Sequence, residues 1–160
     1  MNQPTRKYPP NMVTKSITIL FWVWEENPLG LVADFTFHDE TGEVNFTYSF
    51  KKMYNGAPGF VHGGILSTVL DEAMGGLCFH LGYIVMTDTM SFKFHKATPV
   101  EKELLIRAWP IKKAKRKVLL ECELTSLDGE ILYVKGEGAF HILPPRFSLI
   151  INRRKNSDCE

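Results

Sequence analysis

The segment that decides the fold is PGFVHGGILSTVLDEAMGG, residues 58–76, which continues as LCFHLG to residue 82. Its apolar residues recur at the spacing of one helical face, which predicts a helix over residues 63–82. The stripe consists of Leu66, Leu70, Ala73 and Leu77, widened by Ile65, Val69 and Met74. A helix that is apolar almost all round should be buried, so we expect a sheet to wrap it.

Strand-like runs flank this helix on both sides. Residues 31–37 and 44–50 alternate in polarity, are rich in aromatic residues and are separated by HDETGE with Gly42, which predicts a β-hairpin. Four more such runs follow the helix, at about residues 85–95, 103–112, 116–127 and 131–142. Strands grouped around a single long helix predict an α+β fold with an antiparallel sheet of about six strands.

Composition narrows the class of protein. The chain has 160 residues, of which 44% are hydrophobic and 23% charged, as in one ordinary globular domain. A net charge of +1 gives no case for a nucleic-acid partner. The three cysteines form no CxxC pair, which argues against a disulfide framework and fits a reducing compartment. We therefore expect a cytoplasmic protein.

The chain is expected to fold as a single domain between two loose ends. Residues 1–16 form a Pro-rich polar arm, residues 17–151 the domain, and residues 152–160 a flexible tail. The run ITILFWVW at residues 17–24 is far shorter than the ~18 apolar residues of a membrane helix. No signal-peptide cleavage site follows it, so we assign it to the fold and expect no membrane partner.

His62, Gly63 and Gly64 lie where a loop ends and the predicted helix begins. The first N–H groups of a helix have no partner inside it, and the helix dipole favours negative charge there. Two glycines also let a ligand approach the backbone closely. The Gly63 N–H is therefore a candidate oxyanion donor, a group typically worth about 10²–10³ in rate. The alternative is a Gly-Gly pair that serves only packing or a turn.

Asp71 lies nine residues after His62, in the middle of the apolar helix. An ionised carboxylate in such a place is costly unless it has a partner or a task. Ser67, Gly75 and Cys78 share its flank and are small, which leaves room for a substrate. The alternative is a solvated helix face, but Asp71 and the Gly-Gly pair together favour a catalytic carboxylate.

The string VHGG, followed by a helix with Asp nine residues after the His, resembles the hot-dog acyl-CoA thioesterases of the PaaI-like and 4-hydroxybenzoyl-CoA branch. The segment ENPLGL at residues 26–31 is also similar to the stretch before the first strand in that family. The resemblance covers about residues 20–143. It implies a curved antiparallel sheet wrapped round one long central helix. It also implies a homodimer with a continuous sheet and with active sites at the dimer interface.

The same resemblance implies roles for individual residues. Asp71 would be the nucleophile or the general base in thioester hydrolysis, and the Gly63 N–H would bind the oxyanion. His62 would orient the loop or contact the thioester. A hydroxyl on the next strand would support the attacking water; Thr87 matches best, with Thr89 as the alternative because strand register cannot be fixed from sequence.

Further candidates concern substrate binding. They are Gly64, Asn55, Ser67, Lys93 and Lys96. Many PaaI-like enzymes carry an Asn six residues before the His, where this chain has Gly56, so Asn55 is a weak match. The lysines are candidates for the phosphates of coenzyme A. The basic run KKAKRK at residues 112–117 is either a solvated hairpin turn or another such contact.

The leading hypothesis is an acyl-CoA thioesterase that needs no cofactor and no metal. The histidines show no metal-ligand spacing such as HExxH, and no GxSxG nucleophile elbow is present. Two alternatives stay open: a hot-dog hydratase or dehydratase acting on acyl thioesters, and a non-catalytic acyl-CoA binding module. Also open are the acyl chain, coenzyme A against an acyl-carrier protein as its carrier, and whether dimers pair into tetramers.

Overall fold

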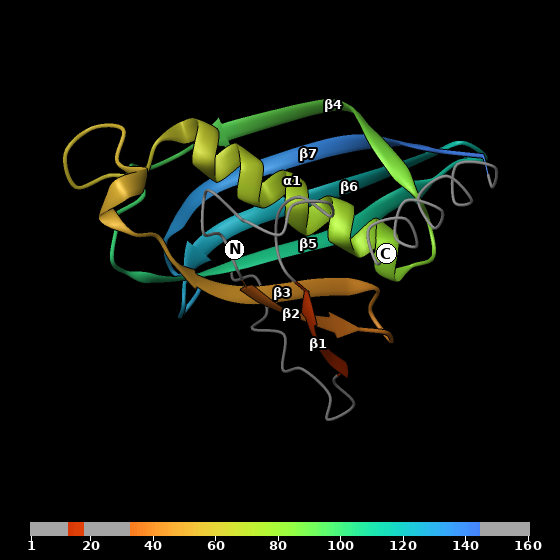
Figure 1. Cartoon of the computed structure of the whole chain (residues 1–160), viewed down its shortest axis with the longest axis horizontal. Coiled ribbons are helices and arrows are strands. Elements are labelled where there is room, and N and C mark those ends of the chain that lie inside the picture. The colour runs from red at the N-terminus through yellow and green to blue at the C-terminus, as the bar shows by residue number, and fades with distance from the viewer. Residues whose placement is uncertain (1–12, 18–32, 145–160) are drawn as a thin grey trace, which may run out of the picture.

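The computed structural model describes residues 13–17 and 33–144. Its strands are β1 (Val13–Ile17), β2 (Ala33–His38), β3 (Glu43–Ser49), β4 (Val85–Phe94), β5 (Glu103–Lys113), β6 (Lys117–Ser126) and β7 (Leu132–Ile142). Its helices are the short 3₁₀ helix η1 (Lys52–Tyr54) and the long helix α1 (Gly63–His80). Helix α1 lies across one face of a single curved sheet (Figure 1). The predicted α+β arrangement is therefore confirmed.

The sheet has seven antiparallel strands in the order β1-β2-β3-β5-β6-β7-β4, one more than the expected number. The additional strand, β1, pairs Val13 with Phe37 of β2 and begins inside the stretch assigned to the arm. Five residues are too few for alternation to stand out from a polar, Pro-rich neighbourhood. The rest of ITILFWVW and all of ENPLGL, residues 18–24 and 26–31, lie outside the described residues.

Helix α1 ends two residues earlier than the pattern predicts. The Leu81 N–H still bonds to the Leu77 carbonyl, and Gly82 then takes a positive φ of 84°. A left-handed glycine just after the last turn is a common way to end a helix. This end directs the chain back along the sheet into β4.

The predicted apolar stripe of α1 faces the sheet and forms the core with it. The buried helix residues are Leu66, Val69, Leu70, Ala73, Met74, Leu77 and Cys78. Large side chains that meet them from the strands include Phe35, Phe37, Phe46, Ile106, Leu120 and Phe140. Within the described residues, no helix is both long and apolar enough to span a membrane.

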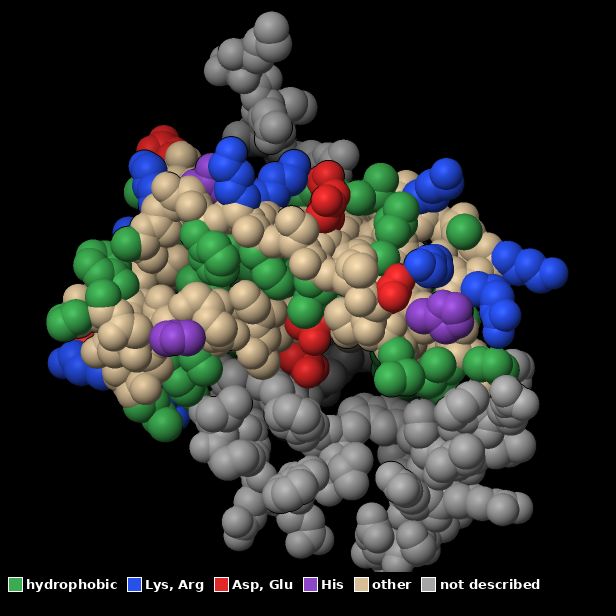
Figure 2. Space-filling view, turned by 90° about the horizontal axis from the view of Figure 1, so that it is seen from above, with side chains coloured by type: hydrophobic (Ala, Val, Ile, Leu, Met, Phe, Trp, Pro, Cys, Tyr) green, Lys and Arg blue, Asp and Glu red, His purple; other side chains and the backbone are tan. Residues whose placement is uncertain are grey.

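Strand β4 forms one edge of the sheet, and α1 leaves most of it uncovered (Figure 1). All but two of its side chains are exposed, including apolar ones: Met90 is 39% exposed and Phe94 50%. Hydrophobic side chains lie open on this side of the molecule (Figure 2). An exposed strand edge with unpaired backbone groups is a template for pairing with another chain.

Candidate active site

The side chain of His62 caps the N-terminus of α1. Its Nδ1 accepts a 2.9 Å hydrogen bond from the Gly64 N–H, and its carbonyl accepts from Ile65 and Leu66. The cap therefore occupies the Gly64 N–H. The Gly63 N–H finds no acceptor among the described residues, as expected for the first residue of a helix. Of the two adjacent glycine donors, Gly63 is the one open to a ligand.

The loop before His62 fixes that residue through its backbone. The His62 N–H donates to the Tyr54 carbonyl at 2.8 Å, and the Gly56 N–H donates to the Phe60 carbonyl at 2.9 Å. A Cβ at Gly56 would lie 3.0 Å from the His62 Cα, a contact tighter than most that side chains make. An Asn could not replace Gly56 unless His62 moved. Asn55 is exposed beside this loop.

Asp71 and Thr87 are brought together, although 16 residues separate them. The Thr87 hydroxyl donates a 3.0 Å hydrogen bond to Oδ1 of Asp71. Partial burial raises the pKa of the Asp71 carboxyl above its usual value of 3.8, and the Thr87 hydrogen bond lowers it in part. The carboxylate is thus desolvated enough to be basic while one of its oxygens is held in place.

A β-bulge at Asp88 determines which hydroxyl of β4 faces the helix. Thr87 pairs with the buried Phe140 and therefore shares its inner face, whereas Thr89 pairs with Ala139 on the opposite face. The bulge inserts Asp88 between the two threonines, so they do not point the same way. Thr87, the better match from the sequence, is the one directed at Asp71.

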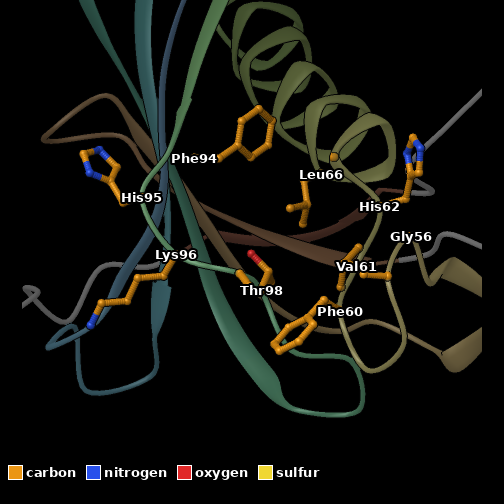
Figure 3. Close-up of a pocket in the computed structure, with 12 residues that line it drawn as sticks. Gly56, Phe60, Val61, His62, Leu66, Phe94, His95, Lys96 and Thr98 are labelled. Atoms are coloured by element: carbon orange, nitrogen blue, oxygen red, sulfur yellow. The ribbon is translucent and has the colours of Figure 1, made fainter.

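A pocket of about 420 Å³ lies between the first turn of α1 and the segment that follows β4. Gly63, Leu66, Phe60 and Phe94 contribute to a largely apolar wall (Figure 3). A Cβ at Gly63 would lie 3.6 Å from Cζ of Phe94, so the end of β4 packs directly against the helix N-terminus. The pocket can therefore hold an apolar group close to the free Gly63 N–H.

Within one chain this pocket and the carboxylate are apart. Gly63 and Asp71 are eight residues apart on the same helix, which at 1.5 Å per residue is about 12 Å. Attack on a thioester needs the attacking group and the oxyanion donor each about 3 Å from adjacent atoms of one carbonyl. A single subunit does not place both groups on the same carbonyl.

The remaining residues named from the sequence lie at different places in the structure, and not all of them face the pocket. Lys96 lines the pocket, but its side chain extends away from the cavity (Figure 3). Lys93 pairs with Lys135 on the outer face of the sheet. The Ser67 hydroxyl donates to the Gly63 carbonyl at 3.0 Å. Burial raises the pKa of the Cys78 thiol to about 12, which leaves it unreactive.

The pocket contains residues that were not singled out from the sequence, among them Phe94 and Thr98. Phe94 ends a strand-like run, where an apolar residue gives no sign of a binding role. Thr98 follows in a short loop. Thr98 is buried, and its hydroxyl has no hydrogen-bond partner among the described residues. Only the fold brings these two residues to the N-terminus of α1, so no local pattern could have identified them.

Among the described residues, no cluster of His, Cys, Asp and Glu side chains has the arrangement of a metal site. The chemistry available is that of a half-buried carboxylate, a strand hydroxyl and a helix N-terminus.

Known proteins are similar to this chain in sequence and in fold. Residues 58–133 match the family model described as Thioesterase superfamily. The Acyl-coenzyme A thioesterase THEM4 of Bos taurus is 33% identical over 93 residues, which are 58% of this chain and 38% of the bovine protein. The chain thus spans less than half the length of the curated relatives that it matches.

Solved structures agree with that match. The crystal structure of one thioesterase superfamily protein has a TM-score of 0.64 and 27% identity, covering 69% of this chain and 53% of the other. The E. coli PaaI protein from the phenylacetic acid degradation operon has a TM-score of 0.59 and 17% identity, covering 62% and 76%. The hot-dog fold that the resemblance implied is confirmed.

Proposed function

We propose that the chain, whose residues 58–133 match the thioesterase superfamily, hydrolyses acyl-coenzyme A to a carboxylic acid and free coenzyme A. The observation that carries the proposal is the half-buried carboxylate of Asp71, held by Thr87 at 3.0 Å. A thioester is an activated acyl group, so an ionised carboxylate and an oxyanion donor suffice for its hydrolysis.

In the first route, Asp71 acts as a general base. It takes a proton from water as the water oxygen attacks the thioester carbonyl carbon, and the Gly63 N–H binds the resulting oxyanion. The C–S bond then breaks, and the proton passes to the coenzyme A thiolate. Thr87 holds Oδ1 throughout, so Oδ2 is the oxygen that takes the proton.

In the second route, the same carboxylate attacks the carbonyl carbon itself. This forms an acyl-aspartyl anhydride and releases the thiolate, and water then hydrolyses the anhydride. A single turnover in H₂¹⁸O tests for the second route. Water attack on the aspartyl carbon of the anhydride leaves ¹⁸O in Asp71 and none in the product acid, whereas the general-base route labels the product acid and never the protein.

The active site is proposed to form between two subunits. The 12 Å separation along α1 requires Gly63 and Asp71 to come from different chains if they act on one thioester. Phe94 packs on Gly63, and Thr87 bonds to Asp71, so the two ends of β4 mark the two halves of the site. An antiparallel pairing of β4 edges about a two-fold axis places the Phe94 end of one strand opposite the Thr87 end of the other.

The exposed apolar side chains of β4 support this homodimer. Met90 lies near the centre of the strand on its inner face, and its exposure ends when a second sheet edge pairs there. The pairing also satisfies the open backbone groups of the edge. Each dimer would then contain two composite sites, related by the same axis.

The activity is tested by thiol release from short, long and aromatic acyl-CoAs. We expect Asp71→Asn to lower kcat by about 10²–10⁴-fold, the usual contribution of a general base. Glu72→Gln is the matched control, since it removes the neighbouring charge from the same helix. Equal losses in both variants would refute the assignment. Tight binding without turnover would indicate a binding module, and water addition to an enoyl-CoA a hydratase.

The composite site has its own test. Gly63→Pro removes the N–H at a helix position that accepts proline, and the extended backbone of His62 suits a following proline. Mixed dimers of the Gly63→Pro and Asp71→Asn chains contain one intact site if the site is shared. We expect the mixture to regain activity that neither parent shows. A mixture as inactive as its parents would overturn the arrangement.

A further inference from the structure

Positive charge is concentrated in the turn between β5 and β6. Five cations occupy six consecutive positions, here named the basic turn: Lys112, Lys113, Lys115, Arg116 and Lys117. All five are exposed. A group of Lys and Arg side chains lies at the right-hand end of Figure 2, the end at which Figure 1 places this turn. We propose that the basic turn binds the phosphate groups of the coenzyme A part of the substrate; this rests on the proposed function.

Two cations fix the basic turn against the rest of the molecule. Lys117 Nζ lies 2.6 Å from Oδ2 of Asp88, the bulged residue of β4. Lys113 Nζ donates to the Tyr83 hydroxyl and lies 4.3 Å from the centre of that ring. Both anchors belong to β4 or to the segment that leads into it. The turn is therefore positioned relative to the strand that carries Thr87.

The other three cations are available to a ligand. No carboxylate of the described residues forms an ion pair with Lys112, Lys115 or Arg116. Arg116 supplies a planar fork of donors that fits phosphate oxygens in pairs, and lysines supply compact charges. Coenzyme A carries a diphosphate and a separate phosphate on its ribose. Three cations on one turn, without ion-pair partners in the described part of the chain, fit that set of anions.

The position of the basic turn suits the geometry of the substrate. The thioester and the phosphates are at opposite ends of the pantetheine arm, so their binding sites must be separated. Thr87, Phe140, Val118 and Lys113 pair in succession across four neighbouring strands. Three strand spacings amount to about 14 Å. The phosphates would thus lie at the mouth of the site while the thioester reaches the carboxylate.

Binding is measured first, because it does not depend on turnover. The test variant is Lys115→Ala with Arg116→Ala, and the matched control is Lys51→Ala with Lys102→Ala, two exposed lysines outside the basic turn. Calorimetry gives the Kd for free coenzyme A and for pantetheine. We expect the test variant to weaken coenzyme A binding about threefold to tenfold, the scale of two exposed ionic contacts. Pantetheine binding and the control should be unchanged.

Added salt gives an independent measure of the same contacts. Exposed charge interactions are screened, so coenzyme A affinity should fall with ionic strength more steeply in the wild type than in the test variant. Equal weakening of pantetheine, equal weakening in the control, or wild-type affinity in the test variant would overturn the proposal. The proposal would also be overturned if the test variant bound coenzyme A as the wild type does but was no longer retained on phosphatidylserine vesicles. That result would assign the basic turn to a membrane surface.

Kinetics then separate this proposal from the proposed function. The same acyl group is offered as its coenzyme A thioester and as its N-acetylcysteamine thioester, which lacks every phosphate. We expect the test variant to raise KM for the first substrate alone and to leave kcat unchanged. If the wild type hydrolyses neither substrate, the proposed function fails, and the calorimetric result still decides whether the basic turn binds phosphate.

Discussion

The Thr87 hydroxyl donates its hydrogen to Oδ1 of Asp71 across the gap between strand β4 and helix α1. This bond joins the sheet edge to the middle of the helix. It also favours the ionised form of the carboxyl, against the burial that disfavours it. The protonation state of Asp71 therefore depends on a side chain from another element.

Removal of that hydroxyl should change the pH dependence of hydrolysis. Either proposed route needs Asp71 ionised, so kcat should rise with pH through the raised pKa of this carboxyl. Thr87→Val removes the contact that lowers the pKa, so the acidic limb of the profile should move to higher pH. At the plateau, the loss should be smaller than the 10²–10⁴-fold expected when the base itself is removed.

Thr89→Val is the control for this experiment. It makes the same chemical change two positions further along β4, where the side chain faces away from the helix. Thr87→Ser, which keeps the hydroxyl, should retain the wild-type profile. A shift of the same size in the Thr89 variant would show that the hydrogen bond is not the cause.

The role of His62 can be divided by two substitutions. His62→Ala removes the acceptor that caps the Gly64 N–H, and the loss of a cap typically costs about 1 kcal/mol of stability. His62→Asn restores a good capping side chain without the imidazole ring. We expect urea unfolding to show the loss in the first variant and its recovery in the second.

The catalytic rate should follow the same order, because the cap orients the helix terminus that presents the Gly63 N–H. kcat/KM should fall in His62→Ala and recover substantially in His62→Asn. A variant with Asn that is as stable as the wild type but as slow as the Ala variant would contradict this. The imidazole would then act on the substrate directly.

Much of this architecture was predictable because it rests on local periodicity. The stripe from Leu66 to Leu77 indicated a buried helix, and alternating runs located six of the seven strands. Strand β1 was missed, since five residues carry too little pattern. The resemblance implied a strand hydroxyl that supports the attacking water, with Thr87 as the best match, but the bond from Thr87 to Asp71 and the bulge that turns Thr89 away came from the structure. No residue type predicts a β-bulge. The sequence therefore could not show which side chains of β4 face the helix.

The proposal that two chains share the site depends on a different kind of information. The resemblance implied a site at a dimer interface, and the eight-residue separation of Gly63 and Asp71 along α1 supports that proposal. Phe94 and Thr98 reach the helix terminus only through the path of the chain after β4. Long-range placement of this kind is set by strand order and has no local signal.

Two neighbouring glycines of α1 should respond oppositely to the same substitution. A Cβ at Gly76 would lie 2.6 Å from Cε2 of Phe35, a core ring, whereas a Cβ at Gly75 meets nothing within 4 Å. Gly76→Ala should lower the free energy of unfolding, because overpacking costs about 1–3 kcal/mol. The higher helix propensity of Ala offsets part of this cost. Gly75→Ala should stabilise by up to about 1 kcal/mol. Urea unfolding checks both, and equal effects would refute the close contact with Phe35.

The raised pKa of Asp71 also has a consequence for stability. A carboxyl whose pKa is higher in the folded state than its usual 3.8 favours folding while protonated, and that contribution is lost as pH rises through the folded value. Asp71→Asn keeps the shape and an oxygen for Thr87 but cannot ionise. At the lowest pH at which both proteins fold, the variant and the wild type should have the same free energy of unfolding. As the pH increases toward neutrality, the variant should become the more stable of the two. Urea unfolding of both proteins across this range measures the difference, with Glu72→Gln as the control for loss of a helix charge. A difference that stays constant with pH would show that folding leaves the pKa of Asp71 unchanged.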